Sequence, residues 1–468
     1  MEKVLLAGIA GVAALATLAM CLQTPRSMLV VLVFYTLFQN LTLYVTGAGF
    51  GLLSSIDLLD ELILLGLTLS WVLRILVHNN LFRRTPLDWP VLLFAVYYVM
   101  SVLWHGVAPA NALLGWRDAV FYVLLFYVLA QFHFSQSFLT RLVKWVMWTA
   151  YLQLAVLLVQ WLVLVARTGS FLLEDDAVGL MGPSGSHKLG YFAGTLLLAY
   201  LGFFRERVYR RKGLILVLVA TVLISSTRAA LFWVPVALTV LLWRDLWRRR
   251  RVRMLWVGTV LLLLVMASGY MTLPETSRAT LLPRKLYSQQ MRTLQGRRFT
   301  RTAYLRYTWN VLQAEGSVLW GVGPGWYASK TASRLGSPYF ESLPPAAAPG
   351  LSQIVTSLGE YGVVGLALIG FIYLTLLRYV ARLSRKSPSP YLRGISAASV
   401  GTLLFYGLAT SSSIAFEIQQ VAIIPWLFAG SALAIARQLK QHEPVPATDF
   451  GSRRVPAVEV RGEETATI

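Results

Sequence analysis

The stretch "LSQIVTSLGEYGVVGLALIGFIYLTLLRY", residues 351–379, decides the class of fold. Apart from Glu360 and Arg378 it carries no charged side chain, and as a helix it is long enough to cross a hydrocarbon core of roughly 30 Å. Similar apolar runs of about twenty residues begin at Val4 and recur almost to Arg437. The sequence therefore predicts an all-α, polytopic membrane helical bundle.

The composition excludes a water-soluble domain. Hydrophobic residues make up 56% of the chain, charged residues only 13%, and the mean hydropathy is +0.61, so the chain lacks the polar surface to cover itself. The formal net charge is +21. In a chain this apolar, basic residues lie at helix ends against anionic headgroups. We therefore expect membrane lipids as partners and no nucleic acid.

Cysteine and histidine give no framework for a disulfide or a metal. Cys21 is the only cysteine, which rules out a disulfide within one chain. The five histidines are scattered and form no HxxxH or ExxH pair, so we expect no metal ion and no cofactor. The first apolar run leads directly into the second without a small-residue cleavage site, and we expect no signal peptide.

Thirteen apolar runs are candidates for spanning helices. They lie at 4–22, 27–45, 56–77, 89–106, 118–132, 144–166, 189–204, 213–226, 229–243, 254–272, 351–379, 395–411 and 416–436. Thirteen spans place Met1 outside, whereas twelve require two of the early runs to form one span or a re-entrant pair. We predict about twelve or thirteen transmembrane helices.

Connections rich in lysine and arginine alternate along the chain with connections that carry little charge. Rich connections, expected in the cytoplasm, contain Arg83 and Arg84, residues 141–144, 205–213, 244–253 and 378–393. The connections between them carry little charge and are expected outside. On this count the basic segment 272–350 also faces outward, which is compatible with the rule because segments longer than roughly 60 residues translocate regardless of charge.

This topology divides the chain into four parts. Residues 1–271 form an N-terminal bundle, 272–350 a large outer loop, and 351–437 the C-terminal transmembrane helices. Residues 438–468 are polar, contain proline and show no periodicity, which is typical of a disordered cytoplasmic tail.

Charged residues occur within or beside the predicted spans. Asp57, Asp60, Glu61 and Arg74 belong to the third, where an ionisable group is costly unless it is paired or faces a cavity. The acids lie about four turns from the arginine, so they need partners on other helices, and bundle packing is favoured over substrate contact. Arg117 and the acid after it open the fifth run, as an ion pair at headgroup level or as a substrate clamp.

Three cations are expected near helix ends on the outer side. Arg228 lies in "ISSTRAALF", residues 224–232, among small neighbours that leave room for the guanidinium to reach inward. Snorkelling to headgroup phosphate is the alternative. His187 and Lys188 open the seventh run, where unpaired helix N–H groups attract an anion. His187 is either structural or has a direct chemical role.

The large loop carries a basic cluster that suits phosphate. Arginine offers a planar fork of donors that binds phosphate oxygens in pairs, and a site of this kind stabilises a diphosphate leaving group without a metal. The natural ligand is a lipid diphosphate. The cluster consists of Arg292, Arg297, Arg298, Arg301 and Arg306.

Aromatic residues and a glycine-rich turn accompany these arginines. Tyr307, Trp309 and Trp326 are candidates for stacking on sugar rings, although Trp and Tyr are also ordinary interfacial anchors. The turn "GVGPGWY", residues 321–327, includes Gly323 and allows close backbone approach. It lacks the strand, lysine and Ser/Thr of a phosphate loop, so we do not predict a nucleotide site.

The order of these motifs resembles the O-antigen ligase superfamily, which includes O-antigen ligases and related polysaccharide polymerases. The resemblance rests on "ISSTRAALF", a large outer loop with an R-x-x-W element at Arg306 to Trp309, "GVGPGWY", and "LGEYGVVGLALIG" at 358–370. It implies a GT-C-like, metal-independent, inverting glycosyltransferase that takes glycan from undecaprenyl diphosphate at the periplasmic face of the inner membrane. Two arginines that bind the diphosphate correspond to Arg228 and to Arg306 or Arg301.

One feature departs from the ligases. They carry a His-Asn pair before the "ELGxxG"-like segment, with the histidine proposed as the base, whereas this chain has Leu351 and Ser352 there. The resemblance leaves Glu341, Glu360 or His187 as the base, or a reaction with little base catalysis. Glu360 is otherwise a helix cap or a partner for an arginine.

Two function classes follow. The missing histidine favours a polymerase of lipid-linked repeat units, for which a chain-length regulator is a further expected partner, over a ligase that transfers glycan to lipid A core or protein. A transporter of an anionic lipid-linked substrate is the alternative from another class. Transporters usually show related halves and broken helices around a midplane site, and the sequence shows no internal repeat.

Overall fold

The computed structural model describes residues 15–45, 59–78, 82–168, 178–181, 186–206, 212–225, 227–248, 301–337, 339, 352–411 and 418–442. All regular secondary structure in these ranges is helical, which confirms the all-α prediction. Residues 15–23 are helical, and a short 3-10 turn, η2, spans Gly179–Met181. The remaining helices are α2 (Pro25–Val45), α3 (Leu59–His78), α4 (Asp88–His105), α5 (Pro109–Val120), α6 (Val123–Gln131), α7 (Gln136–Thr168), α8 (Ser186–Arg205), α9 (Lys212–Ile224), α10 (Arg228–Arg248), α14 (Arg301–Ala314), α15 (Lys330–Leu335), α17 (Gln353–Lys386), α18 (Pro390–Ala409) and α19 (Gln419–His442).

The chain is a polytopic bundle. Among the described residues, four helices are long and apolar enough to cross a membrane, namely α7, α17, α18 and α19, and the bent pair α5 and α6 makes a fifth if it is one span. The predicted total of about twelve or thirteen stays a prediction. The run at 254–272 and most of the run at 4–22 lie outside the described residues.

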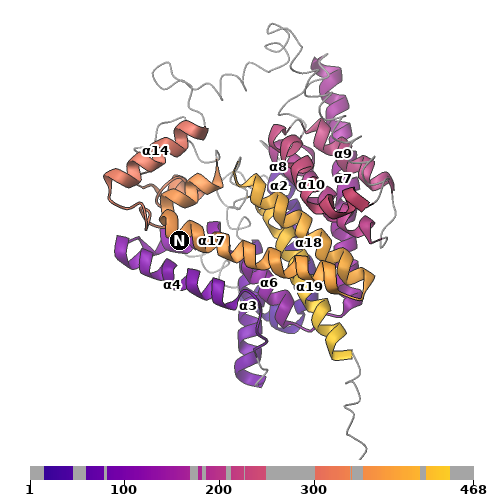
Figure 1. The fold of residues 1–468 in the computed structure, drawn as a ribbon, viewed down its shortest axis with the longest axis horizontal. Coiled ribbons are helices and arrows are strands. Elements are labelled where there is room, and N and C mark those ends of the chain that lie inside the picture. The colour runs from indigo at the N-terminus through magenta and orange to yellow at the C-terminus, as the bar shows by residue number, and fades with distance from the viewer. Residues whose placement is uncertain are drawn as a thin grey trace, which may run out of the picture.

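Helix α19 is the central element of the bundle (Figure 1). It packs against α2, α6, α8 and α18, and its side chains from Val421 to Ala436 are almost all buried. A Cβ at Gly430 would lie 2.8 Å from the Leu129 side chain of α6, so glycine allows these two helices to approach closely. A helix that is buried on every side has apolar residues all round, and α19 shows this pattern.

Small residues bring α8 and α18 together. A Cβ at Gly202 of α8 would lie 2.3 Å from the backbone nitrogen of Ala398, and one at Gly401 of α18 would lie 3.0 Å from the Leu198 carbonyl oxygen. Ser399 donates to the Ile395 carbonyl at 2.8 Å, so its hydroxyl is satisfied within α18. Membrane helices associate largely by such close packing of small side chains, because lipid gives no hydrophobic driving force between them.

Helix α19 also connects two ends of the molecule. At its start, Gln419 donates to Glu61 at 3.2 Å, and near its other end Arg437 donates to the carbonyls of Ala130, Arg83 and Arg84. The intervening stretch of about eighteen residues rises about 27 Å, close to the thickness of a hydrocarbon core.

We name the two ends by their contents. The loop end holds Gln419 and the segment 301–337, which docks there. The basic end holds Arg83, Arg84 and Arg437. Arg26 lines a cavity with Arg83, so the connection at 23–26 belongs to the basic end as well.

The fifth predicted span, 118–132, is not one straight helix. The chain enters α5 at Pro109, whose fixed φ suits a first helical turn, and α6 continues at an angle of 67°. Between them Leu124 N–H donates to the Phe121 carbonyl at 3.0 Å, an i to i−3 bond that tightens the turn. The bend lies beside buried charges on α3, which are described below.

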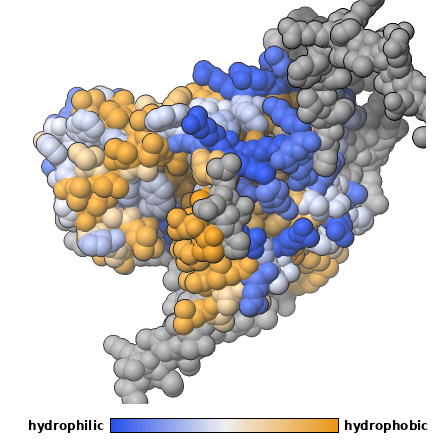
Figure 2. Space-filling model, turned by 90° about the horizontal axis from the view of Figure 1, so that it is seen from below, coloured by the Kyte–Doolittle hydropathy of each residue, from blue (hydrophilic) through white to orange (hydrophobic). Residues whose placement is uncertain are grey.

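Apolar side chains also cover the outside. On α4 an exposed apolar face runs through Leu92, Val96, Val99 and Leu103 at helical spacing, with Trp104 81% exposed. The view from below in Figure 2 shows broad apolar areas beside a hydrophilic patch. An exposed face of this kind belongs against acyl chains, which supports a membrane location for the bundle.

Replacing Gly202 by alanine tests the packing of α8 on α18. The added methyl group collides with backbone rather than with a flexible side chain, so we expect a loss of about 1–3 kcal/mol and a lower melting temperature in detergent. Gly407→Ala, on α18 where nothing lies within 4 Å, is the control and should melt no lower than the parent protein. Equal melting of the two variants would contradict this packing.

Candidate functional site

The segment "GVGPGWY" is inserted into a break in α17. At Gly362 the backbone leaves the helical region, with φ 62° and ψ −168°. Four backbone hydrogen bonds of 2.9–3.2 Å join the two segments at this break. They run from Val322 N–H to the Gly359 carbonyl, from Gly323 N–H to the Glu360 carbonyl, from Val363 N–H to the Val318 carbonyl and from Val364 N–H to the Leu319 carbonyl.

These bonds replace the ones that α17 loses. In an unbroken helix Val363 N–H would donate to the Gly359 carbonyl, and Val364 N–H to the Glu360 carbonyl, four residues back. The inserted segment supplies a new partner for each of the four groups. An unpaired backbone group away from water costs several kcal/mol, so the break and the segment depend on each other.

Glycine is required where the two backbones meet. A Cβ at Gly321 would lie 2.3 Å from the Glu360 carbonyl oxygen, and one at Gly362 would lie 2.4 Å from the Leu319 carbonyl oxygen. Both residues have positive φ, which L side chains rarely adopt. Gly359 lies against the Tyr327 ring, where an added Cβ would come within 2.2 Å of a ring carbon. The motif is therefore a docking turn.

Glu360 lies beneath this turn. Its side chain is buried, with 2% of the residue exposed, against Ser329 and the backbone of Gly325 and Tyr327, and its Oε1 has no hydrogen-bond partner among the described residues. A carboxylate in this position anchors the turn to α17. The geometry favours this anchoring role over contact with an acceptor sugar.

Helix α14 carries an inner and an outer face. Thr308 bonds the Tyr327 hydroxyl at 2.7 Å, and Tyr304 stacks on the same ring with centroids 6.3 Å apart. Burial raises the pKa of Tyr327, so its hydroxyl stays protonated at neutral pH. Arg306 and Trp309 lie one turn apart and are both exposed. The docked turn thus holds α14 with an arginine and a tryptophan facing outward.

The other aromatic candidates for sugar stacking are less exposed to solvent than Trp309. Tyr307 is half-buried in the small core beneath α14. Trp326 is half-buried, and its carbonyl accepts from Ser337. Gly323 serves the docking described above. Of the predicted stacking residues, Trp309 is the most open, with 40% of the residue exposed.

The starts of α8 and α10 meet. A Cβ at Gly190 would lie 2.2 Å from the Thr227 hydroxyl and 2.7 Å from the Ser225 hydroxyl, so glycine lets the two helix starts touch. Arg228 is the first residue of α10, and Lys188 lies in the first turn of α8. Two helix N-termini therefore converge, with a basic residue on each. Unpaired N–H groups and the helix dipoles favour an anion at such a place.

A buried ionic cluster joins α3, α5 and α19. Arg117 forms a salt bridge with Glu61 at 2.5 Å, and Tyr122 donates to Asp60 at 3.0 Å. Partners on other helices were predicted for these acids, and the structure confirms this. Arg117 pairs with Glu61, and its neighbour Asp118 accepts from Thr331 at 2.7 Å.

Arg74 lies away from this cluster. It donates to the Leu22 carbonyl at 3.1 Å, and its guanidinium lies 5.1 Å from the centroid of the Phe132 ring. The sequence-based expectation that Asp60 and Glu61 do not pair with it is confirmed.

Several residues that fix the site carried no recognisable signal. The Tyr97 hydroxyl donates to the Trp320 and Tyr361 carbonyls, and Asn111 donates to the Gly325 carbonyl at 3.3 Å. Each reaches a backbone oxygen more than two hundred residues away in the chain. Such contacts depend on tertiary structure, and no local spacing encodes them.

The candidate residues form two groups. Helix α14 lies on one side of the α17 and α18 pair, and α8 and α10 lie on the other (Figure 1). The structure thus brings Lys188 near the start of α10 but keeps Arg306 apart from them. Arg297, Arg298, Arg292 and Glu341 lie outside the described residues, as do the side chains of Arg228, Arg301 and His187.

Ser352 stands where the resemblance places a catalytic pair. Its hydroxyl caps α17 by accepting from Val355 N–H at 3.5 Å, and it donates to the Thr410 carbonyl at 3.3 Å. This residue therefore fixes the start of α17 against the end of α18.

The chain matches no known protein-family model, and a comparison with curated proteins finds no significant match.

Gly362→Ala tests the insertion into α17. The required φ and the 2.4 Å approach to Leu319 both exclude a side chain, so we expect a cost of about 1–3 kcal/mol and release of the segment 301–337. Hydrogen exchange of that segment should rise. Gly370→Ala, on the same helix with nothing within 4 Å, should leave it unchanged. Unaltered protection in Gly362→Ala would contradict the docking.

Arg117→Gln tests the buried ion pair. Removing one partner leaves Glu61 uncompensated, and we expect a loss of about 3–5 kcal/mol. The double variant Glu61→Gln/Arg117→Gln should recover part of it in thermal melting. The control is Arg393→Gln, because its pair with Glu206 at 2.9 Å is more exposed and should contribute below about 1 kcal/mol. Additive losses in the double variant would contradict a coupled pair.

Proposed function

We propose that this protein is a metal-independent membrane glycosyltransferase. It polymerises undecaprenyl-diphosphate-linked oligosaccharide repeat units into exopolysaccharide, capsule or O-antigen, with the loop end facing the periplasm of a bacterial inner membrane. The observation that supports this best is the convergence of the α8 and α10 starts beside Lys188 and Arg228. The order of sequence motifs supplies the substrate class.

Two helix starts suit a diphosphate for a physical reason. Each start offers N–H groups without intrahelical partners, and the two dipoles add at the point where they meet. The fork of Arg228 adds paired donors for phosphate oxygens. Charge that develops on the departing diphosphate is then stabilised by groups already in place.

Helix α14 supplies the glycan side of the site. Arg306 and Trp309 face outward, where a ring can stack on sugar while the guanidinium holds a hydroxyl or phosphate oxygen. Because α14 lies across the α17 and α18 pair from α8, one small ligand does not fill both places (Figure 1). In the proposal the diphosphate lies at the helix starts and the sugars of the repeat unit extend towards α14.

In the proposed reaction an acceptor hydroxyl attacks the anomeric carbon of the donor glycan. A base takes the hydroxyl proton, the bond from the anomeric carbon to the diphosphate oxygen breaks, and undecaprenyl diphosphate leaves with inversion. His187, in the first turn of α8, is the candidate base because it lies next to Lys188 at the proposed diphosphate site. Glu360, buried beneath the turn, takes the anchoring role.

A ligase uses the same donor and a different acceptor. Lipid A core or a protein then replaces the second repeat unit. A gene neighbourhood with flippase and repeat-unit glycosyltransferase genes favours the polymerase, and one with core-sugar genes favours the ligase.

One observation favours a transporter as the second candidate. Two broken helices touch, since the Tyr361 hydroxyl beside the break in α17 donates to the Gly115 carbonyl of α5 at 3.1 Å, and α5 bends into α6 by 67°. Broken helices near a buried charge cluster are typical of transporters. Such a protein would move an anionic lipid-linked substrate without extending it.

Extension in detergent separates the two classes. Purified protein is mixed with an undecaprenyl-diphosphate oligosaccharide and EDTA, and products are resolved by gel. A detergent micelle does not separate two compartments, so a transporter would leave the donor chemically unchanged in this assay. We expect a ladder of longer glycans and release of undecaprenyl diphosphate. If the donor stays intact although the protein is folded, the proposed glycosyltransferase activity is rejected.

Arg228→Ala and Arg306→Ala should each abolish chain extension with normal protein level, because each removes a guanidinium from the proposed donor site. Arg228→Lys should restore little activity, since an ammonium lacks the planar fork. Arg382→Ala, an exposed arginine on α17 beyond the proposed site, serves as the control and should extend normally. Full activity of Arg228→Ala would contradict the diphosphate site, and full activity of Arg306→Ala would contradict the role of α14 at the glycan.

A further inference from the structure

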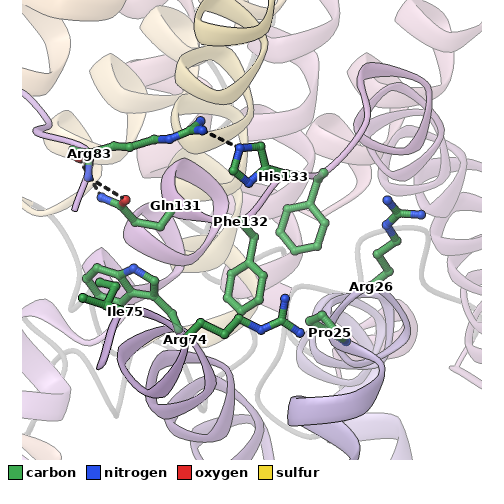
Figure 3. Close-up of a pocket in the computed structure, with 10 residues that line it drawn as sticks. Pro25, Arg26, Arg74, Ile75, Arg83, Gln131, Phe132 and His133 are labelled. Carbon is green, nitrogen blue, oxygen red and sulfur yellow. Dashed lines mark hydrogen bonds between the residues drawn. The ribbon is translucent and has the colours of Figure 1, made fainter. Parts of the chain in front are cut away.

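A basic cavity lies at the end of the bundle opposite the docked loop. Its volume is about 600 Å³, and it opens among α2, α3 and the connection before α7. Figure 3 shows Arg26, Arg74 and Arg83 around it, together with His133 and Phe132. The glycosyltransferase proposed above gives this cavity no role.

The lining is positively charged and aromatic. Among the described residues that line the cavity there is no aspartate or glutamate, although three are arginines. Trp71, Phe132 and Phe134 supply flat apolar faces. Three guanidinium groups around one cavity repel each other unless an anion balances them. The positive charge of the lining therefore favours binding of an anion in the cavity.

Two of the arginines are held in place by the protein. Arg74 donates one N–H to the Leu22 carbonyl at 3.1 Å and lies over the Phe132 ring, which leaves further N–H groups of its five for a ligand. Gln131 fixes the backbone of Arg83, because it accepts from the Arg83 backbone N–H at 3.2 Å and donates to the Arg83 carbonyl at 2.8 Å. Such fixed donors lose little side-chain entropy when they bind.

His133 keeps the Arg83 side chain turned into the cavity. The guanidinium hydrogen-bonds His133 Nε2 (Figure 3), and arginine is always the donor, so this nitrogen accepts. Burial and the neighbouring Arg83 lower the pKa of His133, which keeps the ring in the neutral form that can accept.

The cavity lies at the level of a membrane surface. Arg74 is near the end of α3, and the last turns of this helix expose Leu76 and Val77, which are 70% and 71% exposed. Trp71 stacks on Tyr127, a usual arrangement for an aromatic pair at an interface. The exposed Leu76 and Val77 follow directly after Ile75, which lines the cavity, so apolar surface for acyl chains lies on the same helix end.

We propose that this cavity binds the phosphate group of an anionic phospholipid. Arginine matches phosphate oxygens with paired donors, and the neighbouring apolar surface accepts the start of the acyl chains. Phosphatidylglycerol is the chosen probe. A soluble phosphate ester would present the same phosphate chemistry, and the experiment separates these two sources.

Binding of radiolabelled phosphatidylglycerol is measured on the full-length protein in neutral detergent. Arg26→Gln/Arg74→Gln removes two cavity arginines and should lower affinity at least tenfold. Arg26→Gln alone leaves the Arg74 contacts with Leu22 and Phe132 intact, so it should fold normally and still weaken binding severalfold. Arg141→Gln, an exposed arginine on α7 near the same end, is the matched control and should bind as the parent does.

Competition with glycerol 3-phosphate identifies the source. If millimolar glycerol 3-phosphate leaves the labelled lipid bound, the lipid headgroup is the ligand. If it displaces the lipid, and labelled glycerol 3-phosphate itself binds the parent protein but not Arg26→Gln, the phosphate site stands with a soluble ligand. Equal binding of either probe by Arg26→Gln, the double variant and Arg141→Gln would overturn the proposal.

Discussion

Hydrogen bonding of the backbone where α17 breaks is the constraint on which the loop end depends. A helix interrupted at membrane depth exposes carbonyls and N–H groups that nothing in the lipid can satisfy. Here the chain before α17 turns back and supplies all four partners, with glycine at both points of closest approach. The position of α14 follows from this exchange, because the Tyr327 ring beneath α14 belongs to the same turn.

The two ends of the bundle are held together by different polar interactions. At the loop end, buried acids on α3 are matched by Arg117 and Tyr122, whereas at the basic end Arg437 ties α19 to the carbonyls of Arg83 and Arg84. Helix α19 joins the two networks through an almost fully buried core. This buried centre holds the proposed glycan site and the proposed phosphate cavity at opposite ends of the bundle.

The sequence predicted the helices well because a bilayer imposes a simple rule on length and hydropathy. The boundaries of α8 and α18 differ from the predicted runs by only a few residues, whereas α7 begins eight residues before its predicted run and α19 extends to His442, into the segment predicted as a disordered tail. The bend after α5 was not predicted, since nothing in the local sequence distinguishes Phe121 and Tyr122, and the contact of Tyr122 with Asp60 of α3 depends on tertiary structure. The role of "GVGPGWY" was only half predicted. Glycine indicated a close approach, but its partner at Gly362 is recognisable only in three dimensions.

The side of the membrane on which each end lies is the central claim, and accessibility of engineered cysteines tests it most directly. Cys21 is fully buried, so a membrane-impermeant maleimide meets little background. Gln313→Cys on α14 and Ser137→Cys on α7 each introduce an exposed thiol. The account predicts that spheroplasts label Gln313→Cys before lysis and Ser137→Cys only after it. Labelling of Ser137→Cys in intact spheroplasts, with Gln313→Cys protected until lysis, would contradict it.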